Sequence, residues 1–376
     1  MDEVKILTVI PVLDESRHLD RCLLSLRNQT FDSRRHRILV LDGGSTDNSR
    51  EIAEKHSVES KNSEGPLIEV LDNPGKYVSS ARNIGLERVE DATHMLEIIG
   101  HTWVPDDHIQ LRVDDLLDAE ESIGKSIGSM GTQIMPSEER NGMPKSIENA
   151  LHSPLGGSGQ FASFEGRGDA SSPAFCLHRV EAVKSIGGWD NRWVAGQDHD
   201  LNHRLRENGW PVMRSDVSFV CMSKRSNLSG LWGMGRRYGY WRMRQLKVYP
   251  NRARLREFLP WIGIITVLLS LASNFIISQN PEMFDNYNFF TGNSDIFFYF
   301  SVLLVQCYIG ILLYISIFRP YKMQSQKRRP DFGMFVSLVV LHISFSLGLL
   351  TGLLHLKPPN NERVKGANNS NNKGRN

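Results

Sequence analysis

The pattern of apolar and polar positions along the first 100 residues defines two kinds of segment, which alternate. Short β-branched apolar runs are typical of buried parallel strands, and leucines at helical spacing follow the first run. Strands are expected at residues 5–13, 36–42, 66–73 and 93–100, and helices at 16–29, 49–56 and 79–89. Because strand and helix alternate, the pattern predicts a doubly wound α/β domain with a mostly parallel, Rossmann-like sheet.

The chain between residues 124 and 225 is less regular. Residues 153–173 are rich in Gly and Ser, which predicts a mobile loop. Residues 176–190 read as a helix closed by a Gly-Gly pair. Residues 197–210, QDHDLNHRLRENGW, read as a helix with Asp198 in its first turn.

Three uncharged apolar segments follow, at 258–278, 296–318 and 332–356, and each is long enough to cross a bilayer. Lys and Arg outnumber Glu by eight to one between Arg236 and Glu257, are absent from 279–295, and number five in 319–331. This distribution predicts a cell-membrane protein of three spans whose N-terminal domain is cytoplasmic. The tail is also basic, which leaves a re-entrant third segment open.

The predicted organisation therefore has four parts. A catalytic or binding domain occupies 1–227, and a basic amphipathic juxtamembrane segment at 228–257 lies on the bilayer surface. Three transmembrane helices occupy 258–356. The Asn-rich residues 357–376 are expected to form a disordered tail.

Charge and cysteine content exclude some classes of function. The 44 Lys and Arg against 42 Asp and Glu give a formal net charge of +2, which argues against nucleic acid as a partner. The four cysteines form no CxxC pair and have no His cluster at zinc-ligand spacing, so reduced thiols are expected. The acidic N-terminus with its short apolar run does not read as a signal peptide.

Carboxylates stand where the first two predicted strands end. Asp14 and Glu15 end the first strand, and Asp42 ends the second, directly before Gly43-Gly44. Such side chains can accept hydrogen bonds from a nucleoside, or they can cap helices. Asp198 is likewise either a general base near a cleft or a partner of the helix dipole.

Five motifs in order, followed by apolar spans, carry a family resemblance. They are LDGGSTD (41–47), NPG (73–75), IGH (99–101), GQDHDLNHRL (196–205) and RYGYWR (237–242). The chain resembles family 2 glycosyltransferases of the GT-A fold over roughly residues 4–355. It is most similar to the branch typified by succinoglycan-biosynthesis glycosyltransferases.

The resemblance implies transfer of a sugar, with inversion, from a nucleotide sugar to a lipid-linked or polysaccharide-precursor acceptor. Asp198 would remove the proton of the acceptor hydroxyl. The residues implied in nucleotide binding are Pro11, Asp14, Glu15, Asp42, Gly43 and Asn83. The residues expected on the acceptor or diphosphate side are Asp200, Arg204, Arg237 and Arg242. The two arginines 237 and 242 are also explained by a basic collar at the membrane surface.

The resemblance fails at the metal site. The family has an acidic motif at the end of the fourth strand, whose first aspartate orients a divalent cation. Here Ile99 takes that position, and Gly100-His101 persist. His101 could recruit Mg²⁺ or Mn²⁺ together with Glu97, Asp106 or Asp107, although Glu97 lies one residue pair back, about 7 Å away.

Two other interpretations of Ile99 stay open. The enzyme could work without a metal, or the domain could be a degenerate module that binds nucleotide or lipid without turnover. A polymerising and exporting synthase is disfavoured, because three spans are few for a channel and MGRRYGYW replaces the Q-x-x-R-W segment of such enzymes.

Overall fold

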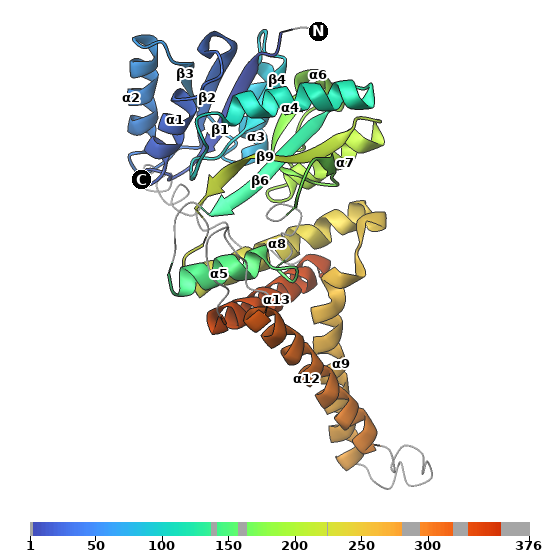
Figure 1. The fold of residues 1–376 in the computed structure, drawn as a ribbon. Helices are drawn as coiled ribbons and strands as arrows, with labels where there is room; N and C mark the ends of the chain where they lie inside the picture. The colour runs from blue at the N-terminus through green and yellow to red at the C-terminus, as the bar shows by residue number, and fades with distance from the viewer. Residues whose placement is uncertain are drawn as a thin grey trace, which may run out of the picture. The chain divides into compact units, whose positions relative to one another are not determined.

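The computed structural model describes residues 3–136, 141–156, 164–223, 225–279, 294–318 and 330–354. The chain divides into two compact units. The first unit comprises Met1–Glu139 and Ser158–Lys224, and the second comprises Arg140–Gly157 and Arg225–Pro359. The first unit contains the mixed sheet and the helices packed on it, and the second is helical (Figure 1).

The first unit is built on one sheet whose strand order is β3-β2-β1-β4-β8-β6-β9-β5, with β7 paired to β9. The first four along the chain are β1 (Ile6–Val12), β2 (His36–Asp42), β3 (Leu67–Asp72) and β4 (His94–Glu97). They pair in parallel, as predicted. The others are β5 (Thr102–Trp103), β6 (Ser129–Pro136), β7 (Gly168–Asp169), β8 (Ala174–Arg179) and β9 (Val212–Met222).

The expectation of a mostly parallel sheet was wrong for its second half. Strand β8 runs antiparallel to both β4 and β6, and β5 and β7 run antiparallel to β9. Only β6 and β9 pair in parallel there. Helix α4 connects β5 to β6, but α5, between β6 and β7, belongs to the second unit, and no helix separates β7 from β8. Between β6 and β8 no helix packed on this sheet therefore enforces one strand direction.

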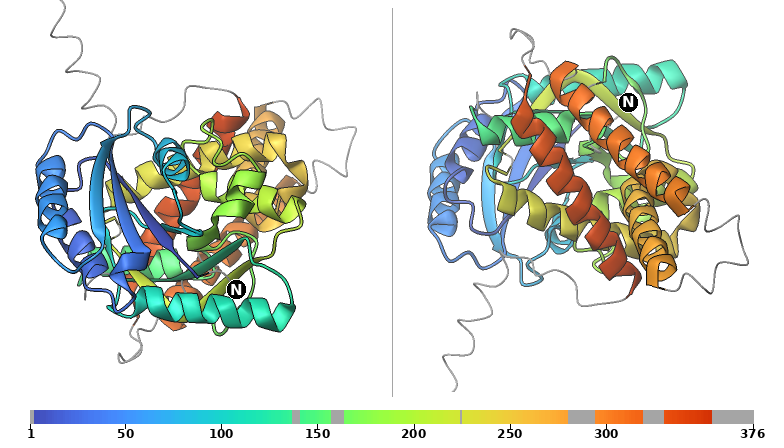
Figure 2. Two further views of the ribbon diagram at one scale, coloured as in Figure 1. Left: turned by 90° about the horizontal axis from the view of Figure 1, so that it is seen from above. Right: turned by 90° about the horizontal axis from the view of Figure 1, so that it is seen from below.

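Helices cover both faces of the sheet, as Figures 1 and 2 show. One face carries α1 (Leu19–Arg27), α2 (Ser49–Lys61) and α4 (His108–Ile123). The other carries α3 (Val78–Glu87), α6 (Val180–Ser185) and α7 (Gln197–Glu207). In β1, Ile6 and Ile10 pack toward the first set, and Leu7 and Val9 toward the second. A strand buried on both faces must be apolar throughout, which is why its sequence shows no alternation.

Two histidines are buried where β2 and β4 begin, and they make the stability of the first unit depend on pH. His36 and His94 are 1% and 2% exposed, and burial lowers the pKa of each to about 3. Each stays neutral in the folded state and takes up a proton on unfolding once the pH falls below about 6.5. We expect the free energy of unfolding to fall by about 1.4 kcal/mol per pH unit for each histidine between pH 6.5 and 3.

Denaturant melts across that pH range check this expectation. The variant His36→Gln should lose part of the pH dependence, whereas His18→Gln, at a partly exposed position, should leave most of it in place. An unchanged slope in His36→Gln would contradict the assignment.

The second unit contains α5 (Met143–His152), α8 (Leu228–Val248), α9 (Leu255–Gln279), α12 (Ser294–Phe318) and α13 (Phe332–Leu353). Two short 3₁₀ turns lie elsewhere, at Ser33–Arg35 in the first unit and Pro250–Arg252 in the second. Helix α5 was not expected in this unit, because it comes from the middle of the chain. Figure 2 shows α9 and α12 side by side.

Polar contacts fix α5 against the start of α13. Ser146 Oγ donates to Asp331 Oδ1 at 2.6 Å, and Asn149 Nδ2 donates to Asp331 Oδ2 at 2.7 Å. The same Asp331 caps α13 by accepting from the Met334 amide. Apolar contacts continue the interface, since α5 buries Ile147 against α8 and α13.

Helices α8 and α13 approach each other closely through small residues. Gly235 of α8 faces Ser344 of α13, Gly239 faces Gly348, and Gly352 of α13 lies against the Tyr240 backbone. A Cβ at Gly239 would meet the Phe345 carbonyl oxygen and would lie 2.9 Å from the Leu349 nitrogen. This is the close packing that glycines spaced four apart allow between helices.

The three predicted apolar segments all form helices, namely α9, α12 and α13. Among the described residues, Phe332–Leu353 is the one helix long and apolar enough to cross a membrane by length and composition, with a mean hydropathy of 2.1. Shorter apolar stretches occupy Glu257–Ser273 and Val302–Phe318. The predicted disordered tail and most of the two loops used to predict orientation lie outside the described residues, as does part of the Gly- and Ser-rich segment.

Candidate functional site

The loops that follow β1 and β2 are tied to each other by side-chain hydrogen bonds. Asp14 Oδ1 accepts from the Thr46 amide at 2.7 Å, and the Asp14 amide donates to Ser45 Oγ at 3.0 Å. Ser45 Oγ in turn donates to Asp42 Oδ1 at 2.6 Å. Asp14 has a φ of +54°, a conformation that Asp tolerates better than most residues. Asp14 and Asp42 therefore lie together at the carboxyl edge of the sheet.

A second set of contacts positions Glu15. The Glu15 amide donates to Ser49 Oγ at 2.7 Å, and the Ser16 amide donates to Asp47 Oδ2 at 3.0 Å. Burial opposes the charge of Asp47, but hydrogen bonds from Ser49 and Ser16 outweigh it and lower the pKa of this carboxyl group. The loop after β1 is thus anchored on the first turn of α2.

Glu15 meets His101 at the end of β4. Glu15 Oε1 lies 2.8 Å from His101 Nδ1, and the Glu15 residue is 6% exposed. A Cβ at Gly100 would lie 3.0 Å from both Cβ and Cγ of Glu15. Glycine at this position therefore allows the backbone to pack closely against the Glu15 side chain. The structure therefore joins two residues that the sequence placed 86 positions apart.

Glu97 belongs to a buried cluster formed with residues of α3 and β8. Its Oε1 lies 3.0 Å from Arg82 Nη1 and 3.0 Å from His178 Nε2, and its Oε2 accepts from the Cys176 amide at 3.4 Å. Burial opposes ionisation, but Arg82 and His178 outweigh it and lower the pKa of Glu97 to about 2. The suggestion that Glu97 helps His101 to hold a metal does not fit this arrangement.

Asp198 is joined to the same cluster. It lies in the first turn of α7, and its Oδ1 accepts from Arg82 Nη1. Its side chain is 38% exposed, whereas Arg82 and Glu97 are almost fully buried. Burial and the charge of Glu97 raise the pKa of Asp198, although Arg82 opposes this. Through Arg82 the Asp198 carboxylate is linked to the end of β4, at the edge where Glu15 and His101 lie.

Several predicted site residues of the first unit make contacts within the fold. Asn83 exchanges two hydrogen bonds with the Trp189 backbone, at 2.7 and 2.8 Å. Arg204 pairs with the buried Asp200 at 2.8 Å and donates to the carbonyl groups at the end of α6. These contacts hold α7 and the loop before it in place. They explain why Asn83, Asp200 and Arg204 occupy these positions even if none of the three binds a ligand.

Pro11 and Gly43 belong to the backbone framework of the polar edge. Pro11 lies within β1 opposite Leu41, and the Gly43 amide donates to the Val12 carbonyl at 2.8 Å. The two remaining predicted residues are in the second unit. Arg242 pairs with Glu257 at 2.7 Å, and Arg237 lies over the Tyr238 ring at 5.7 Å.

Known proteins are similar to this chain in sequence and in fold. The model of the glycosyl transferase family 2 matches residues 8–184. The succinoglycan biosynthesis protein ExoA of Rhizobium meliloti is 29% identical over 259 residues, which cover 68% of this chain and 74% of that protein. Residues 8–184 of this chain therefore form a glycosyltransferase domain that matches family 2.

One further protein is similar to this chain in sequence, and one solved structure is similar to it in fold. The dolichyl N-acetyl-alpha-D-glucosaminyl phosphate 3-beta-D-2,3-diacetamido-2,3-dideoxy-beta-D-glucuronosyltransferase of Methanococcus voltae is 22% identical over 210 residues, covering 54% of this chain and 62% of its own length. The mannosyltransferase PcManGT from Pyrobaculum calidifontis, solved with GDP-Man and Mn²⁺, has a TM-score of 0.57 at 11% identity. That match covers 95% of this chain and 89% of the other, and it shows a shared fold.

The side chains of this glycosyltransferase do not fit a divalent cation at the end of β4. His101 and Glu15 are the donors there, and they are already bonded to each other. Among the described residues, the group of three candidate ligands that lie close together is Glu97, Cys176 and His178. Arg82 lies 3.0 Å from Glu97, and burial raises the pKa of the Cys176 thiol, so this buried group is also a poor cation site.

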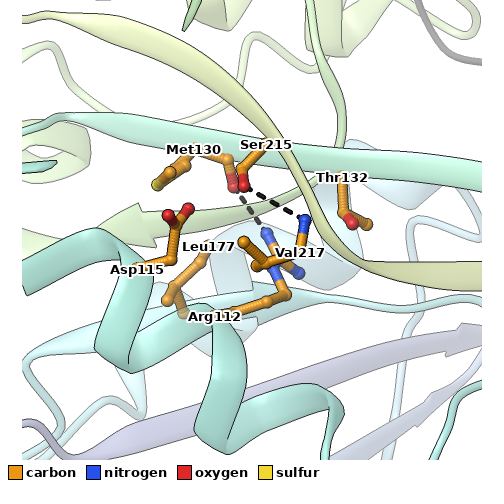
Figure 3. Close-up of a pocket in the computed structure, with 7 residues that line it drawn as sticks. All are labelled: Arg112, Asp115, Met130, Thr132, Leu177, Ser215 and Val217. Carbon is orange, nitrogen blue, oxygen red and sulfur yellow. Dashed lines mark hydrogen bonds between the residues drawn. The ribbon is translucent and has the colours of Figure 1, made fainter. Parts of the chain in front are cut away.

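A small pocket lies beside α4 (Figure 3). Arg112, Thr132 and Val217 are among the side chains that line it. The Arg112 guanidinium donates to the Met130 carbonyl, as Figure 3 shows, so its charge is already partnered. None of the seven residues that line this pocket is a predicted site residue.

Arg82 is the residue of this site that the motifs did not single out. A signal was present, because Arg82 stands among Ser79, Ala81 and Gly85, small residues that α3 buries. Glu97 likewise interrupts an apolar strand. A charge on an otherwise buried face predicts a partner of opposite charge.

Proposed function

We propose that this glycosyltransferase moves a sugar, with inversion, from a nucleotide sugar to a lipid-linked or polysaccharide-precursor acceptor at the cytoplasmic face of a membrane. Asp198 acts as the general base. One observation carries the proposal: Arg82 links the partly exposed Asp198 carboxylate to β4, which ends at the edge where the Asp14, Glu15 and Asp42 loops meet.

The donor half of the proposal rests on the polar edge of the sheet. Ligands of open α/β sheets bind outside the carboxyl ends of the strands. Asp14, Asp42 and Glu15 hold two loops in fixed conformations at that edge, where a nucleotide would meet backbone and carboxylate groups. The PcManGT structure with GDP-Man supports a nucleotide-sugar donor, because it has the same fold.

The acceptor half rests on the second unit. Large apolar side chains are exposed along α9 and α12, for example Leu268 at 59%, Phe275 at 66% and Tyr299 at 66%. Such surfaces are stable in lipid rather than in water. Together with α13 and the eight basic residues between 236 and 257, they favour three membrane helices and an acceptor presented at the bilayer. The dolichyl sugar phosphate in the name of the Methanococcus voltae relative is consistent with this class.

A direct assay tests the function. Protein purified in detergent is incubated with labelled UDP- and GDP-sugars and a lipid extract from its host membrane. We expect label to enter the organic phase. Transfer confined to water-soluble acceptors would overturn the lipid-linked acceptor, and nucleotide binding without any transfer would favour the degenerate-module alternative that Ile99 suggests.

Nucleotide binding is expected not to depend on a divalent metal. Since Ile99 cannot coordinate a cation and Glu97 is engaged by Arg82, the described residues at the end of β4 offer the bonded His101–Glu15 pair. Titration calorimetry with UDP and with GDP should give, for each nucleotide, dissociation constants in Mn²⁺ and in chelator within about threefold of each other. A tenfold difference would correspond to about 1.4 kcal/mol of binding free energy contributed by the metal. Binding that tightens more than tenfold in Mn²⁺ would show that a cation site exists.

A further inference from the structure

Arg82 connects three elements at one point of the first unit. It projects from α3, and its Nη1 reaches both Glu97 Oε1 on β4, at 3.0 Å, and Asp198 Oδ1 on α7. The Arg82 side chain is 4% exposed, so its charge depends on these two partners. Its guanidinium carbon also lies 5.8 Å from the centroid of the Trp189 ring.

We infer that Arg82 is a positioning residue that holds the Asp198 carboxylate for proton removal, and that buried Glu97 fixes Arg82 in this role. The inference rests on the proposed function of Asp198 as the base. Asp198 is the partly exposed member of the cluster and Glu97 is the buried one. The Arg82 guanidinium therefore joins the buried Glu97 carboxylate to the Asp198 carboxylate, which acts as the base. His178, 3.0 Å from Glu97, closes the far side of the cluster.

The cluster also sets how readily Asp198 ionises. The groups that act on its charge are Arg82, Glu97 and His178, and the Cys176 thiol interacts with it as well. With Arg82 in place, the repulsion between the two carboxylates is balanced by one shared positive charge. Without Arg82, Asp198 would face Glu97 unscreened, and its side chain would be free to rotate away from the acceptor.

The variants Arg82→Gln and Arg82→Lys test this role, with Arg88→Gln at the exposed end of α3 as the matched control. We expect Arg82→Gln to lower kcat on the order of a hundredfold with KM for the nucleotide sugar unchanged, because misplacement of a base by about 1 Å has that effect. In the pH profile of kcat of Arg82→Gln, the fall in activity on the acidic side should occur at higher pH than in the wild type. Arg82→Lys should recover part of kcat and restore the pH profile, and Arg88→Gln should match the wild type.

Glu97→Gln is a second test of the positioning role, needed because the Arg82 variants could fail to fold. It keeps Arg82 but removes the charge that fixes it, and we expect kcat to fall about tenfold or more, again without a change in KM. The double variant Arg82→Gln/Glu97→Gln leaves no unpaired buried charge and should fold, as nucleotide binding would show, yet keep the low kcat. Folding variants with wild-type kcat and pH profile would overturn the inference.

The outcome for Asp198 separates this inference from the proposed function. If Asp198→Asn loses activity while the Arg82 and Glu97 variants keep theirs, the positioning role fails and the proposed function stands. If Asp198→Asn is fully active, the proposed base fails, whatever the Arg82 variants do. A loss of both kcat and nucleotide binding in every Arg82 and Glu97 variant would mean that the cluster only holds the fold, and would also overturn the positioning role.

Discussion

The variant Asp198→Asn is expected to lower kcat by about 10²–10⁴-fold, the contribution typical of a general base. The amide nearly matches the carboxylate in size and can still lie in the first turn of α7, but it cannot take a proton from the acceptor hydroxyl. Nucleotide binding should be unchanged, because Asp198 contacts Arg82 and none of the loops at the ends of β1 and β2 in the described residues. Steady-state kinetics with the labelled donor measure the loss.

The control for this prediction lies on the same helix. Glu207→Gln removes an exposed carboxylate from the last turn of α7 and should leave kcat unaltered. If Asp198→Asn retained more than about a tenth of the wild-type kcat, another group would have to act as the base. A large rise in the nucleotide KM would instead show that Asp198 contributes to donor binding.

The variant Gly239→Ala is expected to destabilise the second unit strongly. Its new Cβ would meet the Phe345 carbonyl oxygen, the Leu349 nitrogen and the Gly348 Cα, which are backbone atoms that cannot rotate away. Helices α8 and α13 would therefore have to separate. We expect the free energy of unfolding to fall by about 1–3 kcal/mol or more, the usual result of overpacking.

Gly263→Ala in α9 is the matched control, because no atom lies within 4 Å of its added Cβ. It should be neutral or stabilising by up to about 1 kcal/mol, since Ala favours a helix more than Gly does. Thermal unfolding in detergent compares the two variants. Equal melting temperatures would mean that α8 and α13 are not packed through these glycines.

The sequence predicted the first half of the sheet well and the second half poorly. The strands expected at 36–42 and 93–100 are built around short apolar runs, and the structure has β2 at His36–Asp42 and β4 at His94–Glu97. The sequence of β6, SMGTQIMP, contains a glycine and ends at a proline, so it shows no clear alternation of apolar and polar residues. Its partner β8 begins after a Gly- and Ser-rich stretch, and no local signal tells which way a strand will run.

The candidate site shows a similar division. Carboxylates at the ends of strands were recognisable, because parallel strands bring their ends to one edge, and Asp14 and Asp42 lie together there. The bond between Glu15 and His101 joins residues 86 positions apart, and no spacing rule could predict it. Asn83 and Arg204 look like ligand-binding residues in the sequence, yet backbone groups of the fold already partner both.

Helix α5 has a consequence for how the protein is made. Its Asn149 pairs with Asp331, which follows 182 residues later, and its apolar side packs on α8 and α13. At about 5–20 residues per second, a ribosome needs about 10–40 s to synthesise the intervening chain. Helix α8 is made earlier in that interval, but the part of α5 that packs on α13 has no partner until α13 emerges. The nascent chain should therefore depend on a chaperone that shields this helix until α13 emerges, and a stop codon placed after residue 227 should leave it permanently exposed and the product prone to aggregation.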